Sequence, residues 1–595
     1  MAFSGDPVDL VEEIKRIDEE YRKQTDPNIW ENANTYYSYS WWISYFVDRM
    51  INRPEVLSEY LPKRAVARHY RGDIHIHKLP LSLWIGYCCG WSLENLLIKG
   101  LRAPFLTAVP PRHIDTALAQ LNQFILMSSQ EWSGAQAVNI FDHYIGVYVV
   151  EEKVPYKKLV QEIQRFVFNT NYPLRVGYQS PFVNITLGIG QIMKDIPLVF
   201  RGEYVDDTVE SYMDGVIAVN KAIIDTFMKG DRYGRSFSFP IMTIPISEGF
   251  DWNGRRWGDL TDRIFELTAR RGSYYFLNGY SVDVNSLMAM CCRLTIDMEA
   301  VRGIWAIPPS TGSINYISIN LPRLALLDRE GKQDFEEGLL DAMESARECL
   351  NAQRRRVEES FKQGLMPLSR EYLPSLEHHY NTIAVIGLPE MGAILRGVPL
   401  EPTYMSEIVE EERKVLEFML GVLDEFSEED GVAYNLEEAP AESTAHKFAK
   451  ADLRMFGERE WIPVFDGEPM YSNSIVPYYV EMSLWERVML EARVQKLFTG
   501  GVMLHIFLRE CVEPEVIKKL IYRICTNTDI VYFSITPSLV VCKKCGTTEP
   551  GLYEKCPVCG SETEIWSRIV GYYRPVRNWH PARRKEFWHR QHYSG

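Results

Sequence analysis

Four cysteines near the C-terminus have the residue type and spacing of a metal site. Cys542 and Cys545 form one CxxC pair, and Cys556 and Cys559 form a second pair ten residues later. Two such turns present four thiolates, which can close a tetrahedral shell around zinc, with iron as the alternative metal. Two disulfides are the other interpretation, but they conflict with the cytoplasmic character argued below. A saturated four-sulfur shell leaves no open coordination position, so the predicted zinc site is structural.

A single glycine follows these cysteines in the stretch "WSRIVGYYRPVRNWH", residues 566–580. Because glycine has no Cβ, the ordinary interpretation of Gly571 is a turn or a bulge. The second interpretation is chemical: its Cα could lose a hydrogen atom and become a planar radical that is delocalised over the two flanking amides. The local sequence alone favours the turn.

The chain of 595 residues carries a formal net charge of −15. Because phosphate contacts need lysine and arginine, this acidic balance argues against direct binding of nucleic acid. No apolar run approaches the roughly 18 residues of a membrane span, and the N-terminal stretch lacks the apolar core of a signal peptide. We therefore expect a cytoplasmic protein without a membrane partner, whose cysteines are metal ligands or redox groups rather than structural disulfides.

The other cysteines fall into two vicinal pairs and three single residues. The pairs are Cys88–Cys89 and Cys291–Cys292. In an extended strand adjacent side chains point to opposite faces, so only one of Cys88 and Cys89 can face a substrate. The single residues lie in helix-like or apolar runs and are expected to be small core residues: Cys349, Cys511 and Cys525.

The spacing of apolar residues predicts a mixed α/β protein. Amphipathic helices are expected at residues 7–23, 334–365 and 407–426. Strands are expected at residues 314–322, 381–389 and 529–537. Each of these runs ends at a proline, after which a loop is expected. Short apolar strands between long helices favour a parallel or mixed sheet covered by helices, with a closed barrel as one form. Most of the chain is expected to form one large domain.

Ordered motifs along nearly the whole chain resemble one family. "RIVGYYRPVRNW", with the four cysteines before it, is similar to the glycyl-radical motif of the anaerobic, class III ribonucleoside-triphosphate reductases. Further segments resemble the same family and occur in the family's order: "YCCGWSL", "GAQAVNIFDHYI", "FVFNTNYPLRVGYQSPFVNITL", "MCCRL", "TGSINYISINLPR" and "AESTAHKFAK". So many matches in one order make a chance resemblance improbable.

The resemblance implies a ten-stranded α/β barrel of the glycyl-radical and ribonucleotide-reductase type, with a central finger loop. The expected divisions are an N-terminal helical segment at 1–60, the barrel at 61–537, the zinc ribbon at 538–566, and the glycyl-radical loop and tail at 567–595. A separate iron–sulfur activase would use S-adenosylmethionine to generate the radical on Gly571.

The resemblance also gives roles to the vicinal cysteines. Cys292, directly before the arginine of "MCCRL", matches the finger-loop cysteine that becomes a thiyl radical and removes the 3′ hydrogen of the ribose. Cys88 matches the family's reducing cysteine, whereas Cys291 is either a second redox thiol or a packing residue. Formate-using members have an asparagine where this chain has Ser313. This departure favours a dithiol protein, similar to thioredoxin or glutaredoxin, as the reductant.

The segment "AESTAHKFAK" is the candidate for binding the substrate phosphates. Ser443 and Thr444 open a helix-like run whose hydroxyls, N–H groups and dipole would form an anion cradle, although a plain helix cap is the alternative. The resemblance suggests ribonucleoside triphosphates as substrates, deoxynucleotides as effectors and a homodimer. The family-like pattern "NANTYYSYS" begins already at Asn32, so a regulatory ATP cone is expected to be absent.

Two other functions are the alternatives. Another glycyl-radical enzyme, of the formate-lyase or dehydratase type, would share the glycine motif but usually lacks the zinc ribbon. A non-catalytic zinc-ribbon protein that binds nucleic acid would need a basic groove, which the net charge disfavours, and would leave Gly571 and Cys292 without a role. An oxygen-sensitive ribonucleotide reductase is therefore the leading prediction.

Overall fold

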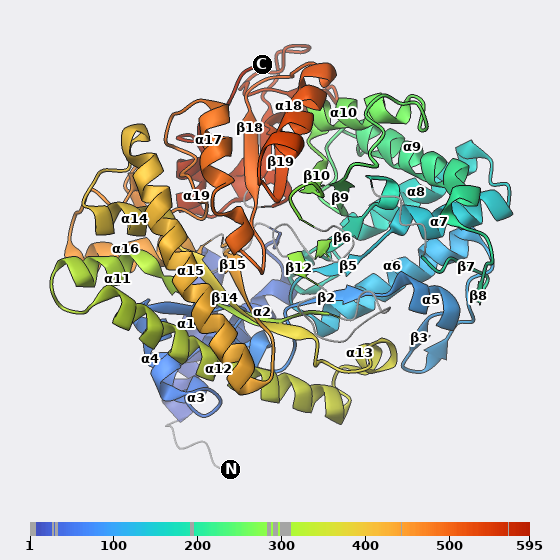
Figure 1. Cartoon of the computed structure of the whole chain (residues 1–595). Coiled ribbons are helices and arrows are strands. Elements are labelled where there is room, and N and C mark those ends of the chain that lie inside the picture. The colour runs from blue at the N-terminus through green and yellow to red at the C-terminus, as the bar shows by residue number, and fades with distance from the viewer. Residues whose placement is uncertain are drawn as a thin grey trace.

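Figure 1 presents a computed structural model of the chain. It describes residues 7–26, 29, 34–190, 196–282, 287–289, 295–297, 311–441, 443–568 and 571–595. Within these residues the largest sheet contains eleven strands, ten of which follow one another along a single path.

The first half of this path consists of five parallel strands. They are β2 (Cys88–Trp91), β5 (Gln136–Val138), β6 (Val183–Thr186), β9 (Ile241–Ile246) and β10 (Tyr274–Asn278). Each pairs in parallel with the next, and all their residues are buried. Burial on both faces is typical of a parallel sheet that helices cover.

The second half consists of β13 (Gly312–Asn320), β14 (His379–Ile386), β15 (Tyr434–Glu438), β18 (Leu504–Leu508) and β19 (Tyr532–Pro537). β13, β14 and β15 are parallel, as are β18 and β19, and β1 (Ile74–Ile76) is added beside β13. The two halves meet in antiparallel pairs, β13 with β2 and β10 with β19.

The two ends of the path also meet. The Glu438 N–H donates to the carbonyl of Gly501 at 2.9 Å, and a parallel bridge joins Glu437 to Gly501, three residues before β18. These contacts close the sheet between β15 and β18. The expected ten-stranded α/β barrel is thereby confirmed.

Helices make the crossovers that parallel strands require. Those of the first half are α5 (Leu93–Lys99), α6 (Ile114–Glu131), α7 (Phe141–Glu151), α8 (Tyr156–Asn171), α9 (Met213–Lys229) and α10 (Leu260–Arg271). Those of the second half are α11 (Leu321–Arg329), α12 (Phe335–Gln363), α13 (Pro367–Tyr372), α14 (Leu388–Arg396), α15 (Met405–Asp430), α16 (Thr444–Phe456), α17 (Leu484–Glu491) and α18 (Pro514–Asn527). In Figure 1 most of these helices lie around the strands.

The predicted elements are found close to their expected places. The helix predicted at 7–23 is α1 (Pro7–Lys23), which packs against α2 (Tyr39–Ile51), and the two other predicted helices are α12 and α15. One expectation was wrong: Pro322 and Pro389 do not lead into loops but are the second residues of helices α11 and α14. The first turn of a helix tolerates proline because its N–H has no partner within the helix.

The single cysteines differ from one another in burial. Cys349 and Cys525 are buried, as expected, but Cys511 is exposed. Cys511 follows the end of β18 in a surface connection, so the expectation of a core position was wrong for this residue. The apolar run before it belongs to the strand and does not extend to the cysteine.

A smaller sheet lies at the C-terminal end of the chain. Its four strands are β20 (Leu539–Val541), β21 (Thr548–Pro550), β22 (Glu564–Arg568) and β23 (Tyr573–Pro575), in the order β21-β20-β22-β23. Helix α19 (Pro581–Phe587) follows, and its Glu586 accepts from Arg583 at 3.3 Å and from Arg590 at 2.8 Å, all three buried. The basic side chains of Arg583 and Arg590 therefore hold the tail in place.

Asp142 is the centre of a buried hydrogen-bond network beside β6. Its carboxylate accepts from the N–H groups of Gly188 at 2.6 Å and Ile189 at 3.1 Å, and from Asn220 Nδ2 at 2.8 Å. Burial would raise its pKa, but His143 and these donors lower the pKa below its ordinary value. The carboxylate therefore stabilises the fold above its unfolded pKa, and this contribution is lost as the pH falls through the lowered folded pKa.

We expect Asp142→Asn to destabilise the protein by about 3–5 kcal/mol, because an amide NH₂ would face donors that then have no acceptor. Thermal unfolding at pH 7 measures the effect. Asp262→Asn is the matched control, since Asp262 lies on α10 with 78% of its side chain exposed. Equal unfolding midpoints for the two variants would contradict this role of Asp142.

Candidate active site and metal centre

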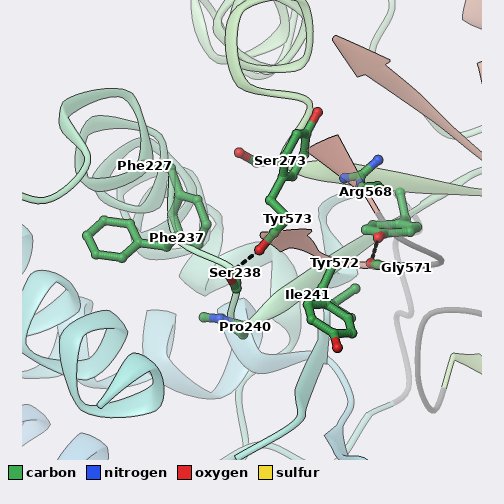
Figure 2. A pocket seen from close by; sticks show the side chains of 11 residues that line it. Phe227, Phe237, Ser238, Pro240, Ile241, Ser273, Arg568, Gly571, Tyr572 and Tyr573 are labelled. Atoms are coloured by element: carbon green, nitrogen blue, oxygen red, sulfur yellow. Dashed lines mark hydrogen bonds between the residues drawn. The ribbon is translucent and has the colours of Figure 1, made fainter. Parts of the chain in front are cut away.

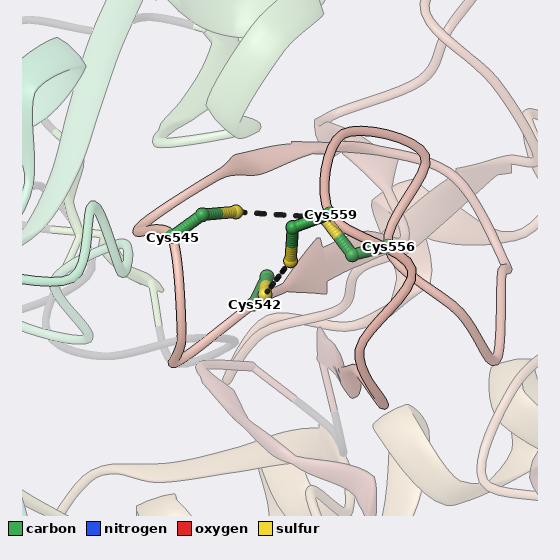
Figure 3. Close-up of side chains that lie close together, drawn as sticks. All are labelled: Cys542, Cys545, Cys556 and Cys559. Carbon is green, nitrogen blue, oxygen red and sulfur yellow. Dashed lines mark hydrogen bonds between the residues drawn. The ribbon is translucent and has the colours of Figure 1, made fainter.

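The four predicted metal ligands come together beside the C-terminal sheet (Figure 3). The Sγ atoms of Cys542 and Cys559 are 3.5 Å apart, those of Cys545 and Cys556 are 3.6 Å apart, and all four lie within 4.8 Å of one another. A tetrahedral zinc ion with Zn–S bonds of about 2.3 Å separates its sulfur ligands by about 3.8 Å, whereas a disulfide brings them to about 2.05 Å. These thiols therefore fit a zinc ion and are not disulfides.

The two halves of this cluster have the same backbone geometry. Gly546 and Gly560 follow the second cysteine of each pair with φ of 77° and 71°, in the left-handed region that favours glycine. Their N–H groups donate to the carbonyls of Cys542 and Cys556, each at 2.9 Å. The two cysteine pairs therefore lie in matching turns.

Gly571 lies in the connection between β22 and β23, and it is buried. The pairing of Arg568 with Tyr573 makes these strands a tight hairpin with the glycine at its tip. Ser238 Oγ donates to the Tyr573 carbonyl at 2.6 Å, and the Tyr275 hydroxyl donates to the Gly571 carbonyl. These bonds hold the hairpin against β10 and the segment that leads into β9, in the pocket shown in Figure 2.

The cysteine cluster and the glycine lie at opposite ends of β22. Cys542 directly follows β20, and the register of β20 with β22 pairs Val541 with Glu564, the first residue of β22. Gly571 comes after Arg568, the last residue of the same strand. A metal bound by the cysteines would therefore fix the strand that leads into the glycine.

Cys88 and Cys89 face opposite sides of β2, as their positions in a strand predicted. Cys88 packs in the hydrophobic cluster that also contains Tyr275 and Tyr572, the residue after Gly571. Cys89 packs on the outer side, in the cluster that contains Trp132. Its Sγ lies 3.7 Å from His379 Nε2, and burial raises the pKa of the Cys89 thiol well above its ordinary value. Of the two cysteines, Cys88 is the one on the glycine's side of the barrel.

The surroundings of Cys88 include a donor and a cation. The Ala135 N–H donates to Cys88 Sγ at 3.2 Å, and a Cβ at Gly134 would lie 2.6 Å from the same sulfur. Burial lowers the pKa of Arg175 to about 10, and negative charge on Cys88 opposes that shift. The N–H group and the guanidinium would both stabilise a thiolate at Cys88.

Ser313 is the direct cross-strand partner of Cys88 in the antiparallel pair of β13 and β2. Its hydroxyl lies 2.9 Å from Thr382 Oγ1 and donates to the Asn315 carbonyl at 3.2 Å. The position at which this chain has serine instead of the asparagine of formate-using members therefore lies next to the candidate reducing cysteine, Cys88.

Cys291 and Cys292 lie outside the described residues. The described segments on either side of them, β11 (Leu287–Ala289) and β12 (Thr295–Asp297), form an antiparallel pair. β11 lies beside β6 of the barrel. The segment expected to be the finger loop thus approaches the barrel wall, and the roles of the two cysteines stay predictions.

Ser443 and Thr444 are at the start of α16, where the sequence placed them. Ser443 occupies the N-cap position, Thr444 is the first helical residue, and both are buried. Lys447 is one turn further along and is close enough to His75 to help lower its pKa, after the larger effect of burial. The sequence interpretation did not include Lys447 or His75 in the anion site.

Four buried glutamates lie near the point where the barrel closes: Glu390, Glu412, Glu438 and Glu491. Burial raises the pKa of Glu390 to about 7 and that of Glu491 to about 8. The pKa of Glu412 is raised well above its ordinary value by burial and then by the other three carboxylates. Within the described part of the chain, neither carboxylate oxygen of Glu412 has a hydrogen-bond partner.

These raised pKa values predict a pH dependence of stability. The folded state holds protons that the unfolded state releases, so stability falls as the pH rises from the ordinary glutamate pKa towards the raised folded values. Glu412→Gln removes a charge without breaking a described hydrogen bond, so we expect the unfolding midpoint to rise by about 2–4 °C at pH 8.5 and to change little at pH 4.5. Glu417→Gln, on the exposed side of the same helix, is the control. A shift of equal size at both pH values would contradict the explanation.

Comparisons with known proteins identify the family. Residues 31–593 match the family model described as anaerobic ribonucleoside-triphosphate reductase. The chain belongs to this family. Its relative of that name in Escherichia coli is 22% identical over 585 residues, covering 86% of this chain and 75% of the relative.

Solved structures show the same fold. The anaerobic ribonucleotide reductase from Thermotoga maritima in complex with dATP and CTP superimposes with a TM-score of 0.71 at 20% identity, over 97% of this chain and 99% of that one. Hydroxyproline dehydratase from Clostridioides difficile is more distant, with a TM-score of 0.56 at 10% identity over 91% and 84% of the chains. This protein is accordingly an oxidoreductase of the anaerobic ribonucleoside-triphosphate reductase family. The leading sequence prediction is confirmed at that level, ahead of both alternatives.

In the described part of the chain, no helix has the length and apolar character needed to cross a membrane.

The structure adds site residues that the sequence interpretation did not select. Tyr275 and Arg568 surround Gly571, and Arg175 lies near Cys88. Arg568 and Arg175 lie within motifs that resemble the family, "RIVGYYRP" and "NYPLRVGYQ". Their place in these motifs could have marked both arginines as candidate site residues. Tyr275 is one of two adjacent tyrosines in a strand, and only the fold distinguishes the one that faces the glycine.

Proposed function

We propose that the chain reduces ribonucleoside triphosphates to 2′-deoxyribonucleotides with a radical that is stored on Gly571. One observation carries this proposal: Gly571 is buried at the hairpin tip, and Tyr572, the next residue, packs in the same hydrophobic cluster as the candidate reducing cysteine Cys88. Burial protects a carbon radical from oxygen and solvent. A turn glycine without chemistry would need neither burial nor a cysteine on the same side.

The proposed reaction begins outside this chain. A radical-SAM activase removes one hydrogen atom from the Gly571 Cα. Cys292 then gives its thiol hydrogen atom to that carbon and becomes a thiyl radical, which takes the 3′ hydrogen of the ribose and returns it at the end. Reduction at C2′ consumes two electrons and releases the hydroxyl as water. Cys88 and a second thiol, for which Cys291 is the candidate, supply the electrons and become a disulfide.

The reductant proposed for this disulfide is a dithiol protein similar to thioredoxin or glutaredoxin. The argument rests on Ser313, which is paired with Cys88 across β13 and β2 and whose hydroxyl is engaged with Thr382 and Asn315. Serine lacks the amide group that formate-using members have at this position. A dithiol restores Cys88 by disulfide exchange, in which a thiolate attacks a sulfur.

The start of α16 is the proposed phosphate site. Ser443 and Thr444 bring hydroxyl groups and the positive end of the helix dipole, and Lys447 adds a cation one turn later. The Thermotoga maritima relative was solved with dATP and CTP. We extend nucleotide substrates and deoxynucleotide effectors to this chain on that basis. A homodimer, which the resemblance to the family implies, and a cytoplasmic location are part of the same proposal.

The proposed zinc ion would be held by Cys542, Cys545, Cys556 and Cys559. Because four thiolates saturate the coordination shell, the ion would supply structural support and no reactive position. What the ribbon does for catalysis is to fix β22, which leads into Gly571.

Anaerobic turnover tests the reductant and the reaction together. The protein is activated with a radical-SAM activase and S-adenosylmethionine, and a ribonucleoside triphosphate is then supplied with either a dithiol or formate. We expect deoxynucleotide with the dithiol and none with formate alone. Formate-only turnover would contradict the argument from Ser313, and a lack of product with both reductants would contradict the proposed reaction.

A further inference from the structure

Gly571 has a hydrogen-bond donor that faces its carbonyl from the barrel wall. Tyr275 is the second residue of β10 and is 1% exposed. Its hydroxyl donates to the Gly571 carbonyl oxygen. If the Cα of this glycine carries an unpaired electron, that carbonyl shares the spin. The tyrosine therefore contacts an atom of the radical itself.

Arg568 lies over the ring of the same tyrosine. Its guanidinium carbon is 4.2 Å from the centre of the Tyr275 ring and 4.9 Å from that of Tyr573. Nη1 donates to Thr536 Oγ1 at 2.8 Å, and Nη2 donates to the Gly272 carbonyl. Figure 2 shows Arg568, Tyr573 and Gly571 around one pocket.

The guanidinium of Arg568 is positively charged, but its described partners are all neutral groups. The side chain is 2% exposed, and its Nε is buried without a hydrogen-bond partner in the described residues. Burial of a cation against hydroxyl, carbonyl and aromatic groups costs more than burial of an apolar side chain. A cation over the face of a tyrosine withdraws electron density from the ring. This withdrawal makes the hydroxyl a stronger hydrogen-bond donor and makes the ring harder to oxidise.

We propose that Tyr275 and Arg568 act as a positioning pair that stabilises the radical on Gly571. Tyr275 holds the glycine carbonyl and favours spin density on its oxygen. Arg568 strengthens this hydrogen bond and opposes the competing step, in which one hydrogen atom would pass from Tyr275 Oη to the Gly571 Cα and leave a tyrosyl radical. This inference rests on the proposed radical at Gly571.

Tyr275→Phe and Tyr573→Phe form a matched pair of variants. Both remove one buried hydroxyl next to Arg568, but the Tyr573 hydroxyl donates to the Pro537 carbonyl at 2.7 Å and not to the glycine. Each activated protein is exchanged into D₂O and studied by electron–nuclear double resonance. We expect the wild type and Tyr573→Phe to show coupling to a hydroxyl deuteron, in addition to that of the exchangeable backbone amides beside the radical. Tyr275→Phe is expected to lose the hydroxyl coupling, and its radical is expected to decay at least about fivefold faster.

Arg568 is tested separately with Arg568→Gln and Arg568→Lys. We expect the glutamine variant to keep the deuteron coupling and to lose the glycyl doublet at least about fivefold faster, with a tyrosyl signal growing in its place. Lysine, which keeps the charge, is expected to restore part of the lifetime. Zinc content and thermal unfolding check that each variant is folded.

Three outcomes would overturn the inference. They are a set of exchangeable couplings in Tyr275→Phe that equals that of the wild type, equal losses in both phenylalanine variants, and a wild-type radical lifetime in Arg568→Gln. The absence of any doublet in the activated wild type would instead contradict the proposed function, so the two failures are distinguishable.

Discussion

Replacement of Cys292 by alanine is expected to leave the glycyl radical in place and to abolish nucleotide reduction. Alanine has no thiol hydrogen to give to the Gly571 Cα, so the stored radical cannot reach the substrate. Loss of a covalently acting group typically lowers turnover by about 10⁴-fold or more. The measurement is deoxynucleotide formation after anaerobic activation, with the radical quantified in the same sample by electron paramagnetic resonance.

Cys511→Ala is the control for this experiment, because it removes one cysteine thiol from an exposed position. The control is expected to keep both the radical and the activity. Full ribonucleotide reduction by Cys292→Ala would show that another residue carries the thiyl radical. The adjacent Cys291 would then be the next residue to replace.

The second large effect is expected from loss of the metal. Cys556→Ser removes one of four sulfur ligands, which frees the cysteine end of β22 while the barrel keeps its own closed sheet. We expect the variant to lose bound zinc and the radical yield to fall at least about tenfold. A tenfold loss corresponds to a destabilisation of the active hairpin position by about 1.4 kcal/mol. Metal content and the size of the radical signal are measured on the same protein.

Cys511→Ser provides the matched control, since it makes the same change outside the cluster. A zinc-free Cys556→Ser protein with a full radical yield would show that the ribbon does not hold the glycine. A coupled loss of zinc and radical, with little change in the thermal unfolding of the barrel, is the result that the hairpin geometry predicts.

Local patterns were sufficient for several parts of the fold. The CxxC spacing predicted a four-thiol cluster, because the turn geometry depends only on neighbouring residues. The alternation of side chains in a strand predicted that Cys88 and Cys89 face opposite sides. Apolar periodicity predicted α12 and α15 nearly to their ends.

Contacts between distant segments could not be predicted in the same way. The closure of the barrel depends on Glu438 meeting Gly501, and the surroundings of Gly571 depend on Tyr275, almost three hundred residues earlier. The pattern of neighbouring residues in the sequence does not predict a contact between residues so far apart. The number of barrel strands came from the resemblance to a family, and the prolines after β13 and β14 were misinterpreted because the helices behind them were not recognised.

The central claim is that Gly571 carries the radical, and electron paramagnetic resonance tests it most directly. Wild-type protein, wild-type protein with α-deuterated glycine, and Gly571→Ala are activated under identical anaerobic conditions. We predict a doublet from the single α hydrogen in the first sample, collapse of its splitting in the second and no signal in the third. A doublet that survives in Gly571→Ala would contradict the account. So would a doublet whose splitting is the same with and without deuterium.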